Sequence, residues 1–261
     1  MKDSTTVEKV WRIFDAFRGE GCMGITQLAE RTSLLPSDVH RLIKSLEHFG
    51  FIEQEAETRK YYLGLELLKL GHLVHQRLEI RKIAEPYLRQ LAQQAEATAN
   101  LAVFDARELE VIFIEQVDSP NEFRVRLRIG APVYPHATGV GKVLTAHMDR
   151  ELARRVFGKR GLVKRTSHTI TNMAKLEKEL DRVLAQGYAL DREEGLKGAF
   201  CIAAPVLDHS GAVAAAVSIS MLASGISGPL ESRLITAVLT NAARISADLG
   251  YHANGAEPTG A

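Results

Sequence analysis

The spacing of apolar residues changes along this chain, and that change limits the folds it can adopt. Before residue 99 they recur mostly at the three- and four-residue intervals of helices. Beyond residue 99, runs with strand-like alternation are mixed with further helical runs. A chain of 261 residues is long enough for two domains. The pattern therefore predicts a mainly helical N-terminal domain and a larger α+β C-terminal domain.

The first part of the chain begins with two helices. Apolar residues have helical spacing from Thr5 to Phe17, and Thr5 with Glu8 has the form of a capping box. Glycines break this helix, after which Thr26 is expected to cap a short second helix. That second helix is predicted to end near Thr32.

A third helix and a β-hairpin complete the first domain. Pro36 is a favourable first residue for the third helix, and Gly50 follows it as a C-terminal cap. Residues 51–63 then show two short strand patterns separated by a polar turn. Three helices followed by a hairpin predict a winged helix-turn-helix over residues 1–64.

The outward face of the third helix carries side chains suited to bind DNA. A short helix, a tight turn and a second helix with polar residues near its start fit the major groove, where base edges present donors and acceptors. A hairpin beside it can contact phosphates or the minor groove. The candidate DNA-binding residues are Thr26, Ser37, Asp38, His40, Arg41, Lys44, Thr58, Arg59 and Lys60.

The charge of this domain leaves a second interpretation open. Residues 1–64 hold 9 Lys and Arg against 10 Asp and Glu, a net charge of −1. DNA-binding domains usually have a basic surface. A winged helix that docks onto another protein is therefore the alternative, whereas a dimer could still bind DNA through local basic residues of each subunit.

The middle of the chain is expected to connect the two domains. Residues 65–81 carry many apolar residues and read as one connecting helix, with an apolar surface wide enough to meet a second copy of itself. Pro86 is placed near the start of a further helix. The effector-type domain is assigned to residues 82–250, and residues 251–261 to a disordered tail.

The C-terminal domain is predicted to hold an antiparallel sheet flanked by helices. The expected strands are residues 101–104, 111–116, 123–129, 188–191, 199–207 and 212–221, and the expected helices are residues 139–147, 149–157, 173–186 and 229–249. Arg124, Arg126 and Arg128 alternate along one of these strands and are interpreted as a solvated face.

One strand of this domain has a face suited to line a pocket. Alternation places Ser218 and Ser220 on the same side as small alanines, which leaves space above them. Buried hydroxyls need partners, supplied either by the fold or by a polar ligand. Cys201 and Ala203 share one face of the preceding strand.

The segment Thr138–Lys142 is expected to start a helix whose free N–H groups could bind a carboxylate. It does not have the spacing of a P-loop. A simple strand-to-helix turn is the alternative reading of its glycines. Asp191, at the end of a strand, could accept a hydrogen bond from a ligand or cap a loop.

Several other classes of protein receive little support. Cys22 and Cys201 form neither a disulfide framework nor a CxxC pattern, and no apolar run reaches membrane-spanning length, so a cytoplasmic protein is expected. The histidines show no metal-ligand spacing, and neither a metal nor another cofactor is predicted. The alternative function is an enzyme that uses Cys201 as a nucleophile, but no base is identifiable, so no catalytic residue is assigned.

Several motifs together resemble the IclR family of bacterial transcription regulators. They are LPSxxHRL from Leu35, GFI from Gly50, YxLG from Tyr61, HATGxGK from His136, GYALDxEE from Gly187, CIAAPV from Cys201 and SIS from Ser218. The resemblance implies a winged helix-turn-helix joined to a GAF-like effector domain. It also implies dimers or tetramers on palindromic double-stranded operators, as repressor or activator of a catabolic operon.

The resemblance further implies that the second domain binds a small organic or aromatic acid. By matching position, the effector-binding residues are Gly139, Val140, Asp191, Cys201, Ser218 and Ser220. Phe123 or Tyr134 could line the apolar end. Val140 is bulkier than the usual residue there and could narrow the pocket, and Asp38 stands where a neutral residue is more usual, which would tend to repel phosphate.

Overall fold

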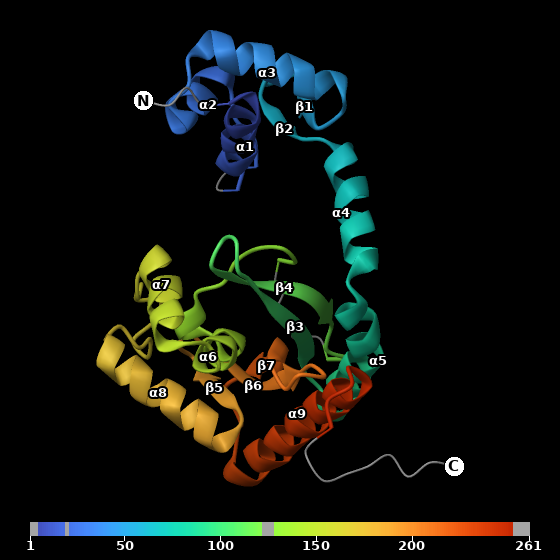
Figure 1. The fold of residues 1–261 in the computed structure, drawn as a ribbon, viewed down its shortest axis with the longest axis vertical. Helices are drawn as coiled ribbons and strands as arrows, with labels where there is room; N and C mark the ends of the chain where they lie inside the picture. Colours follow the sequence, from blue (N-terminus) through green and yellow to red (C-terminus); the bar gives the residue numbers. More distant parts are fainter. Residues whose placement is uncertain (1–4, 19–20, 122–127, 253–261) are drawn as a thin grey trace. The chain divides into compact units, whose positions relative to one another are not determined.

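The computed structural model describes residues 5–18, 21–121 and 128–252. Its contacts divide the chain into two compact units, residues 1–77 and residues 78–261 (Figure 1). Residues 122–127, which include most of the strand expected at 123–129, lie outside the described residues. Residues 253–261 of the expected tail also lie outside them.

Unit 1 has the element order of a winged helix-turn-helix, as the sequence predicts. Its elements are α1 (Thr6–Ala16), α2 (Ile25–Thr32), α3 (Pro36–His48), β1 (Ile52–Gln54), β2 (Tyr61–Leu63) and α4 (Leu65–Arg77). Strands β1 and β2 pair in antiparallel register. Ile13, Leu28 and Ile43 are fully buried, one from each of the first three helices, and form its core with Ile52 of β1.

Local capping predicts the start of α1 but not that of α2. Thr5 caps α1 as expected, since its hydroxyl accepts from the N–H of Glu8. The predicted cap at Thr26 is wrong, because α2 begins at Ile25 after Gly24, whose N–H donates to the Gln27 side chain. The helix begins earlier because Met23 pairs with the hairpin through Tyr61, a contact that depends on the tertiary fold.

The connecting helix is shorter than expected. Helix α4 ends at Arg77, Leu78 has a non-helical ψ of 91°, and α5 runs from Glu79 to Ala95. The expectation of one helix over residues 65–81, with Pro86 near the start of the next, is therefore wrong. Pro86 lies inside α5. Leu78 packs against the core of unit 2, which accounts for the break at this position.

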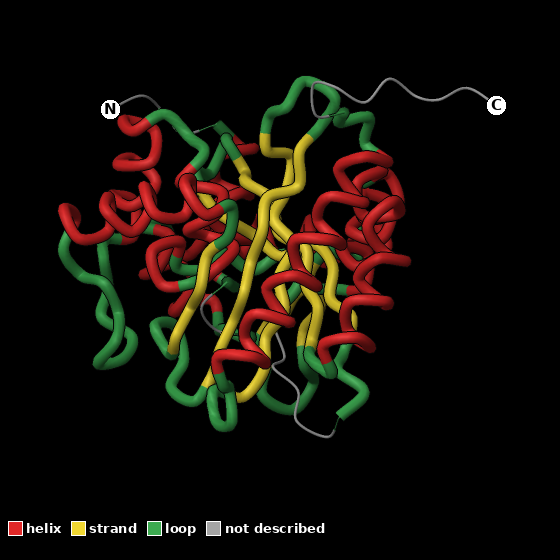
Figure 2. The backbone as a smooth tube through the Cα atoms, turned by 90° about the horizontal axis from the view of Figure 1, so that it is seen from below, coloured by secondary structure: helices red, strands yellow, loops and turns green. Residues whose placement is uncertain are grey.

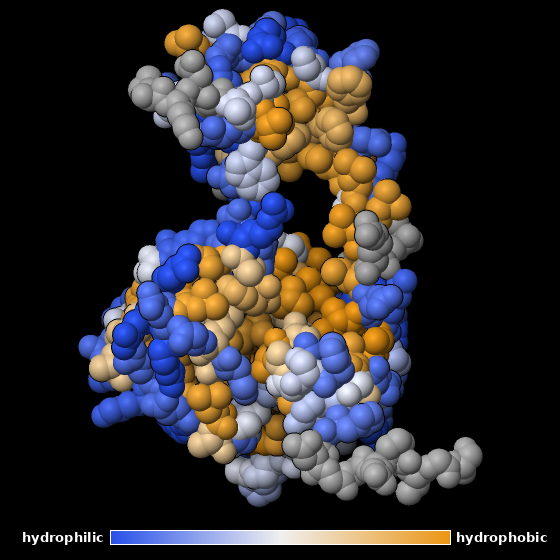
Figure 3. All heavy atoms as spheres, in the orientation of Figure 1, coloured by the Kyte–Doolittle hydropathy of each residue, from blue (hydrophilic) through white to orange (hydrophobic). Residues whose placement is uncertain are grey.

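Helix α4 carries apolar side chains that unit 1 does not cover. Leu65, Leu68, Leu73 and Val74 are each more than half exposed. In Figure 3 the surface over α4 is largely hydrophobic. An isolated helix with such a surface would expose unfavourable apolar area to water.

Unit 2 contains a five-stranded antiparallel sheet, which confirms the predicted α+β class. Its strands are β3 (Thr98–Asp105), β4 (Glu110–Val117), β5 (Ala189–Arg192), β6 (Ala199–Leu207) and β7 (Val213–Leu222). Their order is β4-β3-β7-β6-β5. Strands that are far apart in sequence, β3 and β7, are therefore neighbours at the centre of the sheet.

Helices cover both faces of this sheet (Figure 2). One face packs against α5 and α9 (Gly228–Asp248). The other packs against α6 (Gly139–Ala146) and α8 (Met173–Gln186), with α7 (Arg150–Arg160) beside α6 and the short helix η1 (Pro135–Ala137). Along each strand, alternate residues enter the two cores. The second layer, around α6, is where the candidate pocket lies.

Within the described ranges, no helix is long and apolar enough to cross a membrane.

Candidate functional site

Helix α3 presents a polar face to solvent. Ser37, His40, Arg41 and Lys44 are exposed. The opposite face packs into the core of unit 1 through Val39, Leu42, Ile43 and Leu46. Burial of one side thus fixes which side chains remain available to a groove of DNA.

Asp38 is held differently from its neighbours on α3. Its carboxylate lies 2.8 Å from the ammonium of Lys9 on α1 and 3.7 Å from the guanidinium of Arg41. The hydrogen bond and charge of Lys9 hold the pKa of Asp38 below its usual value of 3.8. The Asp38 charge is therefore compensated within unit 1, which reduces the repulsion that it would exert on a phosphate.

The hairpin exposes the residues expected at its tip. Thr58, Arg59 and Lys60 are all exposed, and the Thr58 hydroxyl donates to Glu55. Arg59 has a φ of +58°, a left-handed conformation that turns the chain tightly. Thr26 is exposed in the first turn of α2. All nine predicted DNA-contacting residues thus lie on unit 1, eight exposed and Asp38 partly buried.

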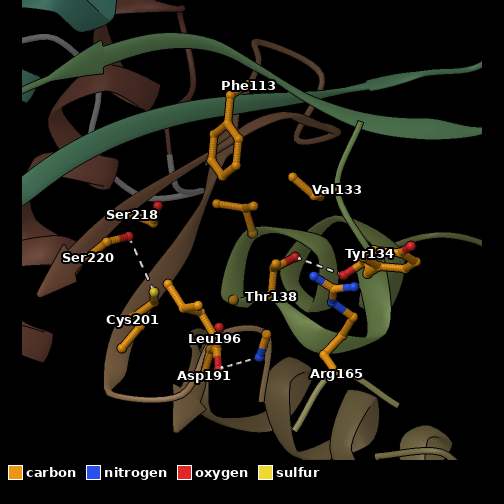
Figure 4. Close-up of a pocket in the computed structure, with 14 residues that line it drawn as sticks. Phe113, Val133, Tyr134, Thr138, Arg165, Asp191, Leu196, Cys201, Ser218 and Ser220 are labelled. Atoms are coloured by element: carbon orange, nitrogen blue, oxygen red, sulfur yellow. Dashed lines mark hydrogen bonds between the residues drawn. The ribbon is translucent and has the colours of Figure 1, made fainter. Parts of the chain in front are cut away.

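Unit 2 contains a pocket of about 210 Å³ between the sheet and α6 (Figure 4). Its lining residues are Phe113, Val133, Tyr134, Thr138, Gly139, Val140, Arg165, Asp191, Gly195, Leu196, Ala199, Cys201, Ser218 and Ser220. The structure places all six residues expected to bind an effector around this one cavity, although they come from α6 and three strands. Tyr134 also lines it, whereas Phe123 lies outside the described residues.

Strand register brings the polar residues together on one side of the pocket. Asp191 pairs with Cys201, and Cys201 pairs with Ser220, so the three lie in a row across β5, β6 and β7. The Cys201 thiol donates to the Ser220 hydroxyl at 3.2 Å. Ser218 follows two residues earlier on the same face of β7.

Asn100 of β3 lies beside both serines and was not predicted from the sequence. It is fully buried opposite Ser218, and its amide nitrogen lies 3.3 Å from the Ser220 hydroxyl and 3.5 Å from that of Ser218. A buried asparagine within an apolar strand was the available signal. Since Asn100 donates to both serines, each hydroxyl proton remains available to donate to a ligand.

The start of α6 offers further hydrogen-bond donors to the pocket, which are its backbone N–H groups. Thr138 caps this helix by accepting from the N–H of Gly141 at 3.3 Å. The N–H groups of Gly139 and Val140 donate to no other described residue. A Cβ on Gly141 would lie 2.4 Å from the backbone of Pro135, so this glycine is required by packing. The glycine motif therefore serves both a tight turn and an open helix end.

Asp191 is a buried carboxyl at the edge of the pocket. It is only 3% exposed, and burial raises its pKa from 3.8 to about 6. The N–H groups of Glu194 and Gly195 donate to it at 2.7 and 3.4 Å, which partly offsets the effect of burial. Neutral pH therefore lies close to the pKa of the Asp191 carboxyl.

Cys201 has the environment of an inactive thiol. Burial raises its pKa to about 12, so the thiolate is not populated at neutral pH. Its hydrogen-bond partner is a serine. His136 contacts the carbonyl of Val163, and His168 lies beside a different cavity. A nucleophilic role requires activation by an adjacent base, which this geometry does not supply.

Lys142 anchors α6 from beneath the pocket. Its side chain is fully buried, and its ammonium lies 2.6 Å from Glu194 and 3.7 Å from Glu179. It also donates to the carbonyl of Leu190. This ion pair ties α6 to the end of β5 and to α8, so it fixes where the free N–H groups of α6 point.

The remaining walls are apolar, apart from one cation. Phe113, Val133 and Leu196 form hydrophobic surfaces, and Arg165 lies beside Tyr134. None of these four was predicted. Phe113 lies on the edge strand β4, and the other three lie in irregular segments, where neither helical nor strand periodicity applies. The pocket thus combines apolar walls with hydrogen-bond donors that converge on one region, the usual character of a small-molecule site.

Comparisons with known proteins agree in both units. A family model described as the IclR helix-turn-helix domain matches residues 6–56, and one described as the bacterial transcriptional regulator IclR C-terminal domain matches residues 72–247. The transcriptional regulator KdgR of Escherichia coli is 34% identical over 248 residues, which cover 95% of this chain and 94% of that protein.

Solved structures show the same fold over almost the whole chain. An IclR transcriptional regulator from Alicyclobacillus acidocaldarius has 27% identity and a TM-score of 0.80, covering 94% of this chain and 98% of that one. An IclR homologue from Microbacterium hydrocarbonoxydans, solved with 4-hydroxybenzoate, has 23% identity and a TM-score of 0.79, with coverage of 94% and 99%.

Proposed function

The chain belongs to the IclR family of DNA-binding transcription regulators, and on this premise we propose that a small organic acid controls its affinity for DNA. The acid binds in the pocket of unit 2, and the protein acts in the cytoplasm on a catabolic operon. The observation that carries this proposal is the convergence of the free N–H groups of Gly139 and Val140 with the hydroxyls of Ser218 and Ser220 in one cavity. These groups are donors, and a carboxylate is an acceptor.

The size of the pocket favours a compact ligand. A cavity of ~150 Å³ is sufficient for benzene. The 210 Å³ found here therefore suits an acid of roughly eight or nine non-hydrogen atoms. The 4-hydroxybenzoate bound to the Microbacterium protein, with ten non-hydrogen atoms by formula, shows that a protein of this fold can hold a small aromatic acid. The low reactivity of Cys201 supports a role in binding over the alternative of an enzyme.

We infer that a homodimer, or a tetramer of paired dimers, binds a palindromic operator. The exposed apolar residues of α4 support this assembly, because a second copy of the helix would cover them. In a dimer, α3 and the hairpin of each subunit would contact one half-site. The acid would act by favouring one arrangement of the subunits, with a coupling energy typically of ~1–3 kcal/mol.

The direct test measures DNA binding and ligand binding on the same protein. A labelled fragment of the region upstream of the regulated operon is titrated with the full chain, alone and with benzoate or other monocarboxylic acids. We expect a salt-sensitive preference for this fragment over random duplex, and a 5- to 150-fold change in affinity with the effective acid. Acids that leave both the melting temperature and DNA affinity unchanged would argue against effector control.

The pKa of Asp191 predicts how acid binding depends on pH. Above pH 6 its carboxylate is ionised and repels a bound carboxylate, whereas below pH 6 it is protonated and can donate. If a bound benzoate raises this pKa by about one further unit, its affinity should improve roughly five- to tenfold between pH 8 and pH 5.5. Isothermal titration calorimetry at several pH values measures this slope.

The Asp191→Asn variant is the control for this titration. It keeps an oxygen to accept from Glu194 but cannot ionise, so the slope should disappear. Since the folded pKa lies above the ordinary 3.8, ionisation of Asp191 costs stability as the pH rises from about 4 to 6. The variant should therefore unfold no more easily than wild type at pH 8. An unchanged slope in the variant would assign the pH dependence to another group.

A further inference from the structure

Arg165 contributes an uncompensated positive charge to the pocket. Its guanidinium lies 4.9 Å from the centre of the Tyr134 ring, and no acidic side chain in the described chain lies within salt-bridge distance of it. Arg160 lies over the same ring at 5.8 Å but pairs with Glu110 at 3.1 Å. Of these two arginines, only Arg165 retains a charge for a ligand.

The segment that carries Arg165 is fixed by hydrogen bonds from its own backbone and from two threonines that follow it. Its own N–H donates to the Thr169 hydroxyl at 3.0 Å. Thr166 and Thr169 in turn donate to the carbonyls of Glu193 and Glu194 at 2.6 and 2.7 Å. These contacts attach the segment to the loop that supplies Gly195 and Leu196 to the pocket. The backbone at Arg165 is therefore held in place before a ligand arrives, which limits the backbone entropy lost on binding.

Two regions of the pocket can bind anions. Figure 4 shows Ser218, Ser220 and Cys201 on one side, and Tyr134 and Arg165 on the other. We propose that Arg165 determines specificity by binding the second carboxylate of a dicarboxylic acid whose first carboxylate contacts Gly139, Val140 and the serines. This inference rests on the proposed function of the pocket.

A carboxylate fits this second region better than a phosphate does. Arg165 supplies one guanidinium, whose single positive charge balances that of one carboxylate in a two-point contact. Asp191, which also lines the pocket, would repel a more highly charged group. The cavity volume of 210 Å³ matches succinate or glutarate, which have eight and nine non-hydrogen atoms by formula.

The test compares each dicarboxylate with its half-amide, which has the same size and one carboxylate fewer. Succinate with succinamate, and glutarate with glutaramate, are titrated into the full-length protein by calorimetry. For at least one pair we expect the wild type to bind the dicarboxylate about tenfold more tightly. Arg165→Gln should lower that affinity about tenfold and leave the half-amide within twofold. Because Arg165 is exposed, added salt should reduce the preference.

The neighbouring Lys164 provides the matched control. It is exposed and does not line the pocket, so Lys164→Gln removes the same charge without changing the preference. Equal weakening of both ligands in Arg165→Gln would overturn the proposal, since Arg165 would then bind the shared carboxylate. It is also overturned if the wild type shows no preference for either dicarboxylate. Benzoate binding in that case would leave the proposed function intact, whereas failure of all acids to bind would remove both.

Discussion

Replacing Lys142 with methionine is expected to lower the free energy of unfolding of unit 2 by about 3–5 kcal/mol. Methionine has a similar length but removes the charge that compensates Glu194, which lies 2.6 Å away and is itself buried. One oxygen of Glu194 already has no hydrogen-bond partner in the structure. A buried carboxylate without a counter-charge is strongly unfavourable. Calorimetric melting and urea denaturation of the full chain measure the loss.

Two variants make this prediction specific. Lys178→Met changes an exposed lysine on α8 and should alter stability by less than about 0.5 kcal/mol. The double variant Lys142→Met with Glu194→Gln removes both charges and should recover part of the loss. A loss below about 1 kcal/mol, or a double variant no more stable than Lys142→Met, would show that this ion pair does not anchor α6.

Removing the Arg41 side chain is expected to produce the largest effect on DNA binding. Arg41 is exposed on the outward face of α3, and an arginine that contacts a base or phosphate contributes roughly 1–3 kcal/mol. Since a dimer would contain two copies, the loss for Arg41→Ala is expected to reach roughly 100-fold in operator affinity. Fluorescence anisotropy at several salt concentrations distinguishes the two kinds of contact. A phosphate contact reduces the salt slope, and a base contact relaxes sequence preference.

Arg12→Ala is the matched control for this measurement. Arg12 is a partly exposed arginine of unit 1 that lies on α1, not on α3, and pairs with Glu8. Its removal lowers the net charge of the unit equally and should change operator affinity only slightly. If Arg41→Ala changes the affinity no more than Arg12→Ala does, α3 does not contact DNA through Arg41.

Several elements were predictable because they depend on local spacing. The sequence placed α8 at residues 173–186 and β6 at residues 199–207, as the structure has them. Helix α3 also begins at the predicted Pro36. In these segments, apolar periodicity and flanking turn residues agree, so the local preference and the tertiary fold specify the same element.

The elements that were predicted wrongly depend on contacts between distant segments. Gly24, not Thr26, precedes α2, because Met23 pairs with the hairpin. The helix break at Leu78 follows from packing against unit 2. A proline within a helix was also read as a helix start, although the surrounding packing tolerates Pro86 inside α5. Local propensity is a weak guide where long-range packing supplies more free energy.

The residues of the pocket likewise fall into two groups, those that the sequence predicted and those that depend on the tertiary fold. Motif resemblance identified six lining residues, and strand alternation independently placed the two serines on one face. Asn100 and Arg165 were missed, since Asn100 reaches the serines only through the pairing of β3 with β7, more than a hundred residues apart. Arg165 lies in an irregular segment that hydrogen bonds from Thr166 and Thr169 attach to the pocket wall.

The amino-acid sequence alone thus determined the two-part organisation, the winged helix-turn-helix and the small-residue face of β7. Each follows from the periodicity and polarity of neighbouring residues, which the chain carries whether or not it is folded. The tertiary structure decided which donors and charges meet in one cavity, and it gave Asp38 and Lys142 their counter-charges. Those features require strand register and helix packing, which are set by the burial of surfaces far apart in the sequence.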